Sequence, residues 1–247
     1  MHETTRHQDN CFLTLTYDQE HLPADGSLNK RHFQKFVKRL RRSLDKRIRY
    51  YHCGEYGDDF GRPHYHAIIF GHVFEDQQPF TRKNGAVYYT SEQLERLWKK
   101  GHCLSTNVTF ETCAYVSRYV MKKVTGKNAA EHYSRPGPID YSTGEQMQVQ
   151  PEYSTMSNGI GLGWYEQFKE EVFPDDYIII NEKKATPPRY YLNKLKEEDQ
   201  AKYDQVIEQR HRMANLHADN QTPDRLAVRE ICASAKVNHK RNLELIR

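Results

Sequence analysis

The chain has 247 residues, of which 37% are hydrophobic and 28% charged, enough for one large domain or for one domain with an appendage. Its apolar runs are far shorter than the roughly 20 residues of a membrane helix, and its five cysteines are widely spaced with no C-x-x-C pair. The composition therefore argues against a membrane protein, a disulfide scaffold and a cysteine zinc knuckle, and we expect a protein of a reducing compartment, the cytoplasm.

The net charge of +4 is unevenly distributed along the chain. Between Asn29 and Arg49 there are ten lysine or arginine residues and one acidic residue, Asp45, and the whole chain contains 17 tyrosines. Cations combined with aromatic side chains are typical of proteins that bind nucleic acid. The same composition also fits a solvated basic helix face and an aromatic core, so both interpretations stay open.

Hydrophobic periodicity predicts an antiparallel sheet with helices packed on it, an α+β domain, in the first half of the chain. Alternating β-branched and aromatic residues predict strands at residues 11–17, 48–56, 63–70 and 102–110. Apolar residues at helical spacing predict helices at residues 29–46, 91–100 and 111–124. Ser91 is expected to cap the second helix, residues 58–61 to form a hairpin turn, and residues 74–89 to form mostly a loop.

The composition changes after about residue 126, which we take as the end of the first domain. Residues 127–153 are predicted to be irregular, and GIGLGW (159–164) to form a turn that enters a short helix. Two further helices are predicted at residues 193–217 and 223–246. We expect the region 127–247 to pack on the first domain or to extend it.

Two glycine-containing segments resemble nucleotide sites only superficially. Gly126-Lys127 is followed by Asn128 rather than by Ser or Thr, and the glycines of residues 159–163 lack the G-x-G-x-x-G spacing. No nucleotide cofactor is therefore predicted.

The sequence His64-Tyr65-His66 lies inside a predicted strand, so the two imidazoles project from the same face. If residues 58–61 form the hairpin turn, Glu55 lies across from them on the neighbouring strand. Two histidines and a carboxylate with open positions are typical of a catalytic metal site. The alternative is a pair of half-exposed histidines with Glu55 in a surface ion pair.

The predicted helix 111–124 carries an apolar stripe that includes Cys113 and Val116, which we expect to pack on the sheet. Tyr115 and Tyr119 are four residues apart and are expected together on the opposite side, next to Lys122. A tyrosine has a pKa of about 10, so a nucleophilic tyrosine needs a nearby cation or metal. The alternative is a tyrosine pair at the edge of the core.

Three segments in order, FLTLTY (12–17), RPHYHAIIF (62–70) and YVSRYVMKK (115–123), resemble the three motifs of the HUH endonucleases. Two tyrosines separated by three residues resemble the two-tyrosine variant of that superfamily. Over nearly its full length the chain is most similar to the replication initiators of gokushoviruses, small single-stranded DNA phages of the Microviridae. The segments that carry this similarity are CFLTLTYDQEHLPADGSL, CGEYGDDFGRPHYH, GIGLGW and PPRYYL.

The resemblance implies a replication initiator that nicks single-stranded DNA at an origin with the help of a divalent metal, Mn²⁺ or Mg²⁺. His64, His66 and Glu55 would hold the metal, which would polarise the scissile phosphate. Imidazole ligands combined with a carboxylate suit Mn²⁺ better than Mg²⁺.

The resemblance also implies that a tyrosine is the nucleophile. Tyr115 or Tyr119 would attack the phosphorus with assistance from Lys122, leaving a covalent 5′-phosphotyrosine and a free 3′-OH for a polymerase. The second tyrosine would allow ends to be rejoined and circles to be closed in rolling-circle replication.

The implied partner is single-stranded origin DNA, opened by a host helicase and copied by a host polymerase in the bacterial cytoplasm. We expect the basic helix to lie beside the metal and tyrosine site. The cations expected to contact the DNA are Lys35, Lys38, Arg39, Arg42, Arg62 and Arg118. The resemblance further implies a longer, cysteine-containing segment before the first motif than the ten residues present here.

Two alternatives use the same residues differently. A non-catalytic protein that binds single-stranded nucleic acid would have only a structural H-x-H pair. An HUH transposase or relaxase would share the tyrosine chemistry, but the tyrosine pair and the C-terminal segments favour a replication initiator.

Overall fold

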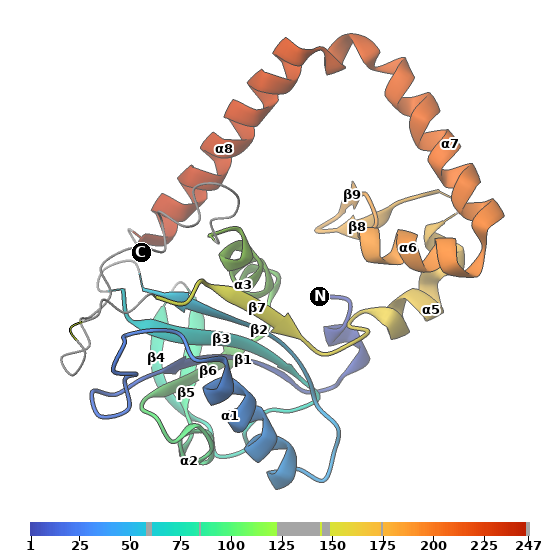
Figure 1. Ribbon diagram of the computed structural model, residues 1–247. Helices are drawn as coiled ribbons and strands as arrows, with labels where there is room; N and C mark the ends of the chain where they lie inside the picture. Colours follow the sequence, from blue (N-terminus) through green and yellow to red (C-terminus); the bar gives the residue numbers. More distant parts are fainter. Residues whose placement is uncertain (58–60, 84, 123–143, 145–148, 174, 246–247) are drawn as a thin grey trace. The chain divides into compact units, whose positions relative to one another are not determined.

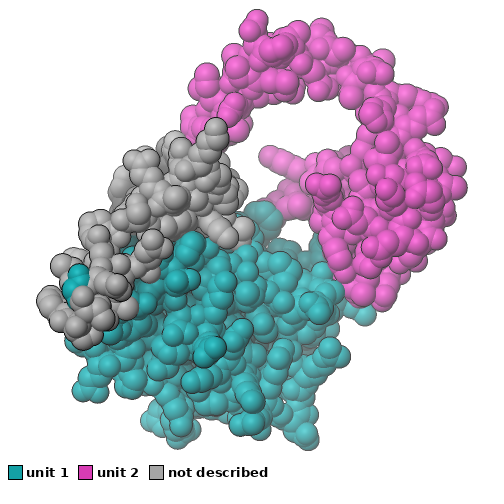
Figure 2. Space-filling model, in the orientation of Figure 1, with its two compact units in different colours: residues 1–161 teal, residues 162–247 magenta. Residues whose placement is uncertain are grey.

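The computed structural model describes residues 1–247 except 58–60, 84, 123–143, 145–148, 174 and 246–247. The chain forms two compact units, Met1–Gly161 and Leu162–Arg247 (Figure 2). None of the helices in the described ranges is both long and apolar enough to cross a membrane.

The first unit is built on a seven-stranded antiparallel sheet in the order β4-β5-β6-β1-β3-β2-β7, which confirms the predicted α+β class (Figure 1). Three adjacent strands of this sheet are β1 (Asn10–Thr16), β2 (Arg49–Tyr56) and β3 (Pro63–Phe70). The remaining strands are β4 (Gln78–Lys83), β5 (Ala86–Thr90), β6 (Cys103–Asn107) and β7 (Tyr153–Met156). A short 3₁₀ turn, η1 (Thr4–Arg6), precedes β1.

Helices α1 (Lys30–Ser43) and α2 (Glu92–Trp98) cover one face of this sheet (Figure 1). Helix α1 buries its apolar stripe of Phe33, Phe36, Val37 and Leu40 against the sheet. Ser91 caps α2 as predicted, since its hydroxyl accepts a hydrogen bond from the Leu94 amide at 3.0 Å.

Helix α3 (Phe110–Lys122) covers the other face (Figure 1). Its Val116 is fully buried in a small cluster with sheet residues that include Phe12, Cys53 and Ile68. The successive side chains of β1 and β3 alternate between this cluster and the larger core under α1. The two faces of the sheet therefore carry different sets of side chains.

The prediction that residues 74–89 form mostly a loop is wrong, because β4 and β5 form a hairpin there. Every residue of β4 is exposed, so the segment lacks the apolar alternation from which a strand is predicted. A register shift between Pro79 and Thr81 interrupts the pairing. The hairpin joins the sheet where Tyr89 pairs with Ser105 of β6, a long-range contact that local pattern does not encode.

The first unit extends beyond the predicted boundary at residue 126, because β7 pairs with β2 at the edge of the sheet. Most of the predicted irregular segment 127–153 lies outside the described residues. The predicted turn before a short helix is confirmed, since α5 begins at Leu162 directly after Gly161. Gly161 has a φ of +81°, a conformation that favours glycine.

The buried carboxylate of Glu3 holds this turn. It accepts a hydrogen bond from the Gly161 amide at 2.6 Å and pairs with Arg49 and His7 at 2.9 Å each. Residues at the two ends of the first unit are thereby joined through one side chain.

The second unit has a small core of its own. Its elements are α5 (Leu162–Val172), β8 (Ile178–Ile180), β9 (Lys183–Ala185), α6 (Arg189–Glu198), α7 (Gln200–Leu216), η2 (Ala218–Gln221) and α8 (Pro223–Leu245). The helix predicted over 193–217 is two helices, because the chain turns at Asp199, whose side chain caps α7 by accepting from the Lys202 amide. The predicted start of the last helix at Pro223 is confirmed.

Arg39 joins α1 to the end of α2. Its Nε donates to the Leu97 carbonyl at 2.6 Å and its Nη2 to the Trp98 carbonyl at 3.0 Å. The last carbonyls of a helix have no partner within the helix, so an arginine that reaches them stabilises the helix end.

We expect Arg39→Ala to lower the free energy of unfolding by about 1–3 kcal/mol, because both carbonyls lose a charged donor. The matched control is Lys38→Ala, one residue earlier and exposed, which should change stability by less than about 0.5 kcal/mol. Urea denaturation of both variants measures the difference. Equal losses for the two variants would show that the Arg39 contact contributes nothing.

Candidate active site

The pairing of β2 with β3 brings Glu55, His64 and His66 together. Glu55 lies directly across from His64, and Cys53 lies across from His66. The two histidines share a face of β3, and Glu55 shares that face of β2. The predicted placement of Glu55 opposite the histidines is therefore confirmed.

Both imidazoles point at one carboxylate oxygen. The distance from Glu55 Oε1 is 2.7 Å to His64 Nε2 and 3.0 Å to His66 Nε2. Glu55 is only 2% exposed and His66 only 4%, while His64 is half-buried. This burial does not fit the alternative of a surface ion pair.

The carboxylate of Glu55 keeps its charge despite this burial. Burial by itself raises the pKa of Glu55, but hydrogen bonds from His64 and His66 and the charges of the two imidazoles outweigh it. The pKa therefore lies below its usual range, and the group is ionised at neutral pH.

The second oxygen of Glu55 is the strongest sign that the cluster holds a cation. Oε2 is buried and has no hydrogen-bond partner among the residues that the structure describes. A buried charged oxygen without a partner is costly, and a bound cation would satisfy it. One ligand atom from each of the three residues lies within 4.8 Å of the others, so together they could hold a metal ion.

The outer nitrogen of each imidazole is also held. His66 Nδ1 lies 3.1 Å from Thr14 Oγ1 on β1, and His64 Nδ1 lies 3.1 Å from the Arg62 carbonyl. When Nδ1 donates to that carbonyl, Nε2 carries the lone pair that binds a cation. Thr14 was not predicted as a site residue, although the T-x-T alternation in FLTLTY already places its side chain on one face of the strand.

Tyr115 lies beside His66. The two ring centroids are 5.1 Å apart in an edge-to-face arrangement, and the Tyr115 ring also lies 6.3 Å from that of Phe12. The prediction that Tyr115 is on the side of the helix away from the sheet is wrong. Residue 115 lies 100° around the helix from the buried Val116, so it occupies the flank of the packed stripe and reaches the sheet.

The remaining predicted residues of this helix are Arg118, Tyr119 and Lys122. They belong to the last turns of α3, but their side chains lie outside the described part of the structure. Their roles stay predictions.

The expectation that the basic helix lies beside the site is wrong. The chain of α1 packs on the face to which Tyr65 points, whereas His64 and His66 point to the face covered by α3. Of the predicted DNA-contacting cations with a described side chain, Arg62 is the one adjacent to the triad in sequence, and it is exposed. The other four are on α1: Lys35, Lys38, Arg39 and Arg42.

Residues 10–124, which include the triad and both tyrosines, match the model of a family described as replication-associated protein ORF2. This part of the chain belongs to the ORF2 family of replication-associated proteins. The resemblance to gokushovirus replication-associated proteins is confirmed by three phage relatives.

These phage relatives share about a third of their residues with the chain. Replication-associated protein VP4 of Bdellovibrio phage phiMH2K is 33% identical over 213 residues, which cover 82% of this chain and 62% of the relative. Replication-associated protein ORF2 of Spiroplasma virus 4 is 31% identical over 220 residues, covering 83% and 64%. Replication-associated protein ORF4 of Chlamydia phage 1 is 33% identical over 210 residues, covering 80% and 49%.

The chain thus spans between about half and two thirds of the length of these replication-associated relatives. No solved structure shows significant similarity to it.

Proposed function

We propose that this chain initiates phage DNA replication by nicking single-stranded origin DNA through a covalent tyrosine intermediate. The observation that supports this most strongly is the buried cluster of Glu55, His64 and His66 with the ring of Tyr115 against it. Membership of a replication-associated family supports the same function. The cluster alone fits many metal proteins, whereas a tyrosine beside it fits transfer of a phosphodiester.

The donor set fits a divalent ion, since two imidazoles and one carboxylate suit Mn²⁺ better than Mg²⁺. Such an ion, when bound, would withdraw electron density from the scissile phosphate. Thr14 and the Arg62 carbonyl keep the two imidazoles oriented.

The reaction proposed for the tyrosine is a transesterification. The phenol oxygen of Tyr115 or Tyr119 attacks the phosphorus and the P–O3′ bond breaks. The departing 3′ oxygen gains one proton for the proton that the tyrosine loses, so the exchange is balanced without ATP. The products are a 5′-phosphotyrosine and a free 3′-OH that primes a host polymerase.

The tyrosine pair supports a second step. One tyrosine holds the old 5′ end while the other cuts the regenerated origin, and the free 3′-OH then attacks the first phosphotyrosine to close a circle. Lys122 is proposed to stabilise phenolate or to contact phosphate, and Arg62 and Arg118 to contact the strand near the site.

The nicking activity is tested with end-labelled single-stranded oligonucleotides that tile the DNA element encoding this chain. With Mn²⁺ present, the wild-type protein should form a covalent protein–DNA band with one or a few of them. The band should be absent when a chelator replaces the ion. If no oligonucleotide gives a band but several bind, the chain is a non-catalytic binding protein and the proposal is wrong.

Thr14 gives a more selective test of the metal site. Thr14→Val removes the hydroxyl next to His66 Nδ1 while keeping the shape of the side chain, so we expect Mn²⁺ affinity to fall about 10- to 100-fold. The control is Thr16→Val on the same strand, whose hydroxyl bonds the His102 carbonyl instead. Titration calorimetry with Mn²⁺ compares the two variants, and equal affinities would remove Thr14 from the site.

A further inference from the structure

Helix α1 carries a row of cations that the site does not use. The helix contains no acidic residue. Arg31, Lys35, Lys38 and Arg42 are spaced four, three and four residues apart, so they share one helix face over about 16 Å. All four side chains are exposed, and within the described residues none of them forms an ion pair.

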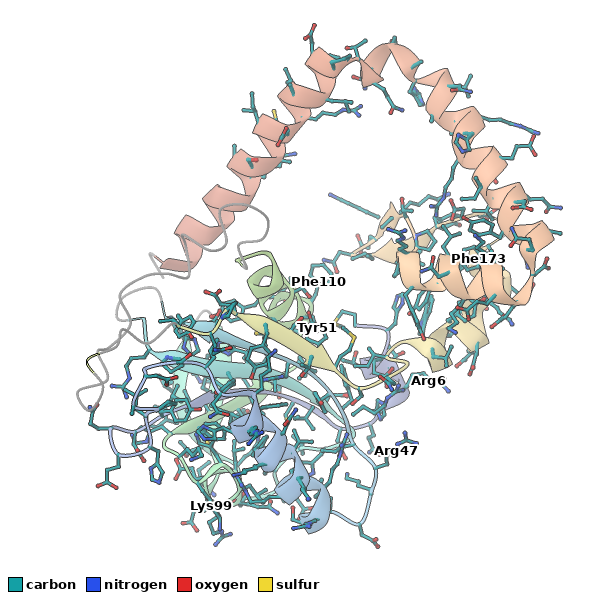
Figure 3. The ribbon with its side chains drawn as sticks, viewed as in Figure 1. Arg6, Arg47, Tyr51, Lys99, Phe110 and Phe173 are labelled. Atoms are coloured by element: carbon teal, nitrogen blue, oxygen red, sulfur yellow. The ribbon has the colours of Figure 1, made fainter. Side chains whose placement is uncertain are left out.

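The row continues into a shallow groove between α1 and α2. The groove has a volume of about 800 Å³, and the side chains that line it include Arg42, Arg96 and Lys99. Lys99 lies on the side of the sheet away from Phe110, the first residue of α3 (Figure 3). One acidic residue, Glu95, also lines the groove.

The aromatic residues near this row are covered. Phe33, Phe36 and Trp98 are almost fully buried. Tyr50 is half-buried, and the guanidinium of Arg41 lies 5.7 Å from its ring. Surfaces that hold single strands stack the bases on exposed aromatic rings, which this surface lacks within the described residues.

We infer that the α1 row and the α1–α2 groove form a second DNA-binding surface, which holds the phosphate backbone of double-stranded DNA. A duplex turns its phosphates outward and its bases inward, so it matches a row of cations without stacking platforms. The surface reads no base sequence. It goes beyond the nicking reaction, because it concerns a different face of the sheet and a different DNA segment from the strand at the triad.

This arrangement separates the two DNA segments across the sheet. The cut strand reaches the triad on the α3 face, while neighbouring duplex lies on the α1 face. Binding of the duplex raises the local concentration of the strand to be cut, without any contact at the triad.

The test measures binding of a fluorescent duplex of unrelated sequence, about 25 base pairs long, by anisotropy over a range of salt concentrations. The variant is the triple substitution Lys35→Gln, Lys38→Gln and Arg42→Gln. The matched control removes three exposed cations of the second unit instead: Lys183→Gln, Arg229→Gln and Lys236→Gln. Both proteins therefore lose the same net charge.

We expect the α1 variant to lose roughly tenfold or more in duplex affinity at low salt. Its plot of log affinity against log salt should be less steep by about 3, since each phosphate contact contributes about 0.9. The control should keep both values close to wild type. Glu95→Gln should act in the opposite direction and raise the affinity, because it removes the one acidic side chain of the groove.

Equal losses in the α1 variant and the control would overturn the inference, since net charge alone would then explain binding. An unchanged Glu95→Gln affinity would remove the groove from the surface. Nicking of a short single-stranded oligonucleotide should be unchanged in the α1 variant. Because duplex binding is measured without nicking, a failure of the nicking proposal leaves this readout intact.

Discussion

Glu55→Gln should lower the affinity for Mn²⁺ at least about 100-fold and remove the covalent protein–DNA band. The substitution keeps the size of the side chain but removes the one negative charge in the cluster. It also replaces an oxygen acceptor with an amide that has to donate next to two imidazoles. Binding of Mn²⁺ is measured by the loss of the free-ion electron paramagnetic resonance signal.

A second variant separates loss of the metal from loss of the fold. His64 is half-buried, so His64→Ala leaves less empty space in the core than a change at His66. It should also lose Mn²⁺ binding, while circular dichroism and the urea midpoint stay near wild type. His211→Ala, an exposed histidine of α7, is the control and should bind Mn²⁺ normally. Normal Mn²⁺ binding by Glu55→Gln would contradict the metal assignment.

The double variant Tyr115→Phe and Tyr119→Phe should lower formation of the covalent band at least about 1000-fold, because no phenol oxygen remains to attack the phosphorus. Phenylalanine keeps the ring of residue 115 against His66 and Phe12. Folding and Mn²⁺ binding should therefore be unchanged. The band is quantified by denaturing gel electrophoresis.

The single variants distinguish the two tyrosines. Loss of the first nucleophile should remove the band, whereas loss of the other should leave nicking intact and prevent closure of circles. Tyr203→Phe, a half-buried tyrosine of the second unit, is the control and should form the band at the wild-type rate. A band of normal strength from the double variant would place the nucleophile elsewhere.

The triad could be predicted from sequence because strand periodicity acts over neighbouring residues. Two histidines at i and i+2 must share a face, and a short hairpin turn leaves few registers for Glu55. The same local rules placed the apolar stripe of α1 and the cap at Ser91. Each of these depends on residues within a dozen positions of one another.

The arrangement of the helices across the sheet could not be predicted in the same way. The central strand β3 is buried on both faces, so its apolar residues Ala67–Phe70 do not indicate which helix covers which side. The position of α1 opposite the triad follows from packing of the whole unit. The exposed hairpin of β4 and β5 was missed for the related reason that its pairing, not its composition, makes it a strand.

Tyr115 shows the limit of periodicity on a helix. The wheel places it beside Val116, but only the tilt of α3 over β2 and β3 decides whether that flank faces solvent or His66. A signal was present in the sequence, since a tyrosine next to a buried valine is not on the opposite side of a helix. The aromatic ring itself adds apolar area that favours burial.

The central claim is that a tyrosine of α3 becomes joined to DNA, and mass spectrometry of the joined peptide tests it most directly. Trypsin cuts after Lys100, Arg118 and Lys122, so Tyr115 and Tyr119 fall into different peptides. After reaction with Mn²⁺ and a cleaved oligonucleotide, we predict a nucleotide-modified peptide 101–118 or 119–122, and neither of them without the ion. Modification of any other peptide, or cleavage without a modified peptide, would contradict the account.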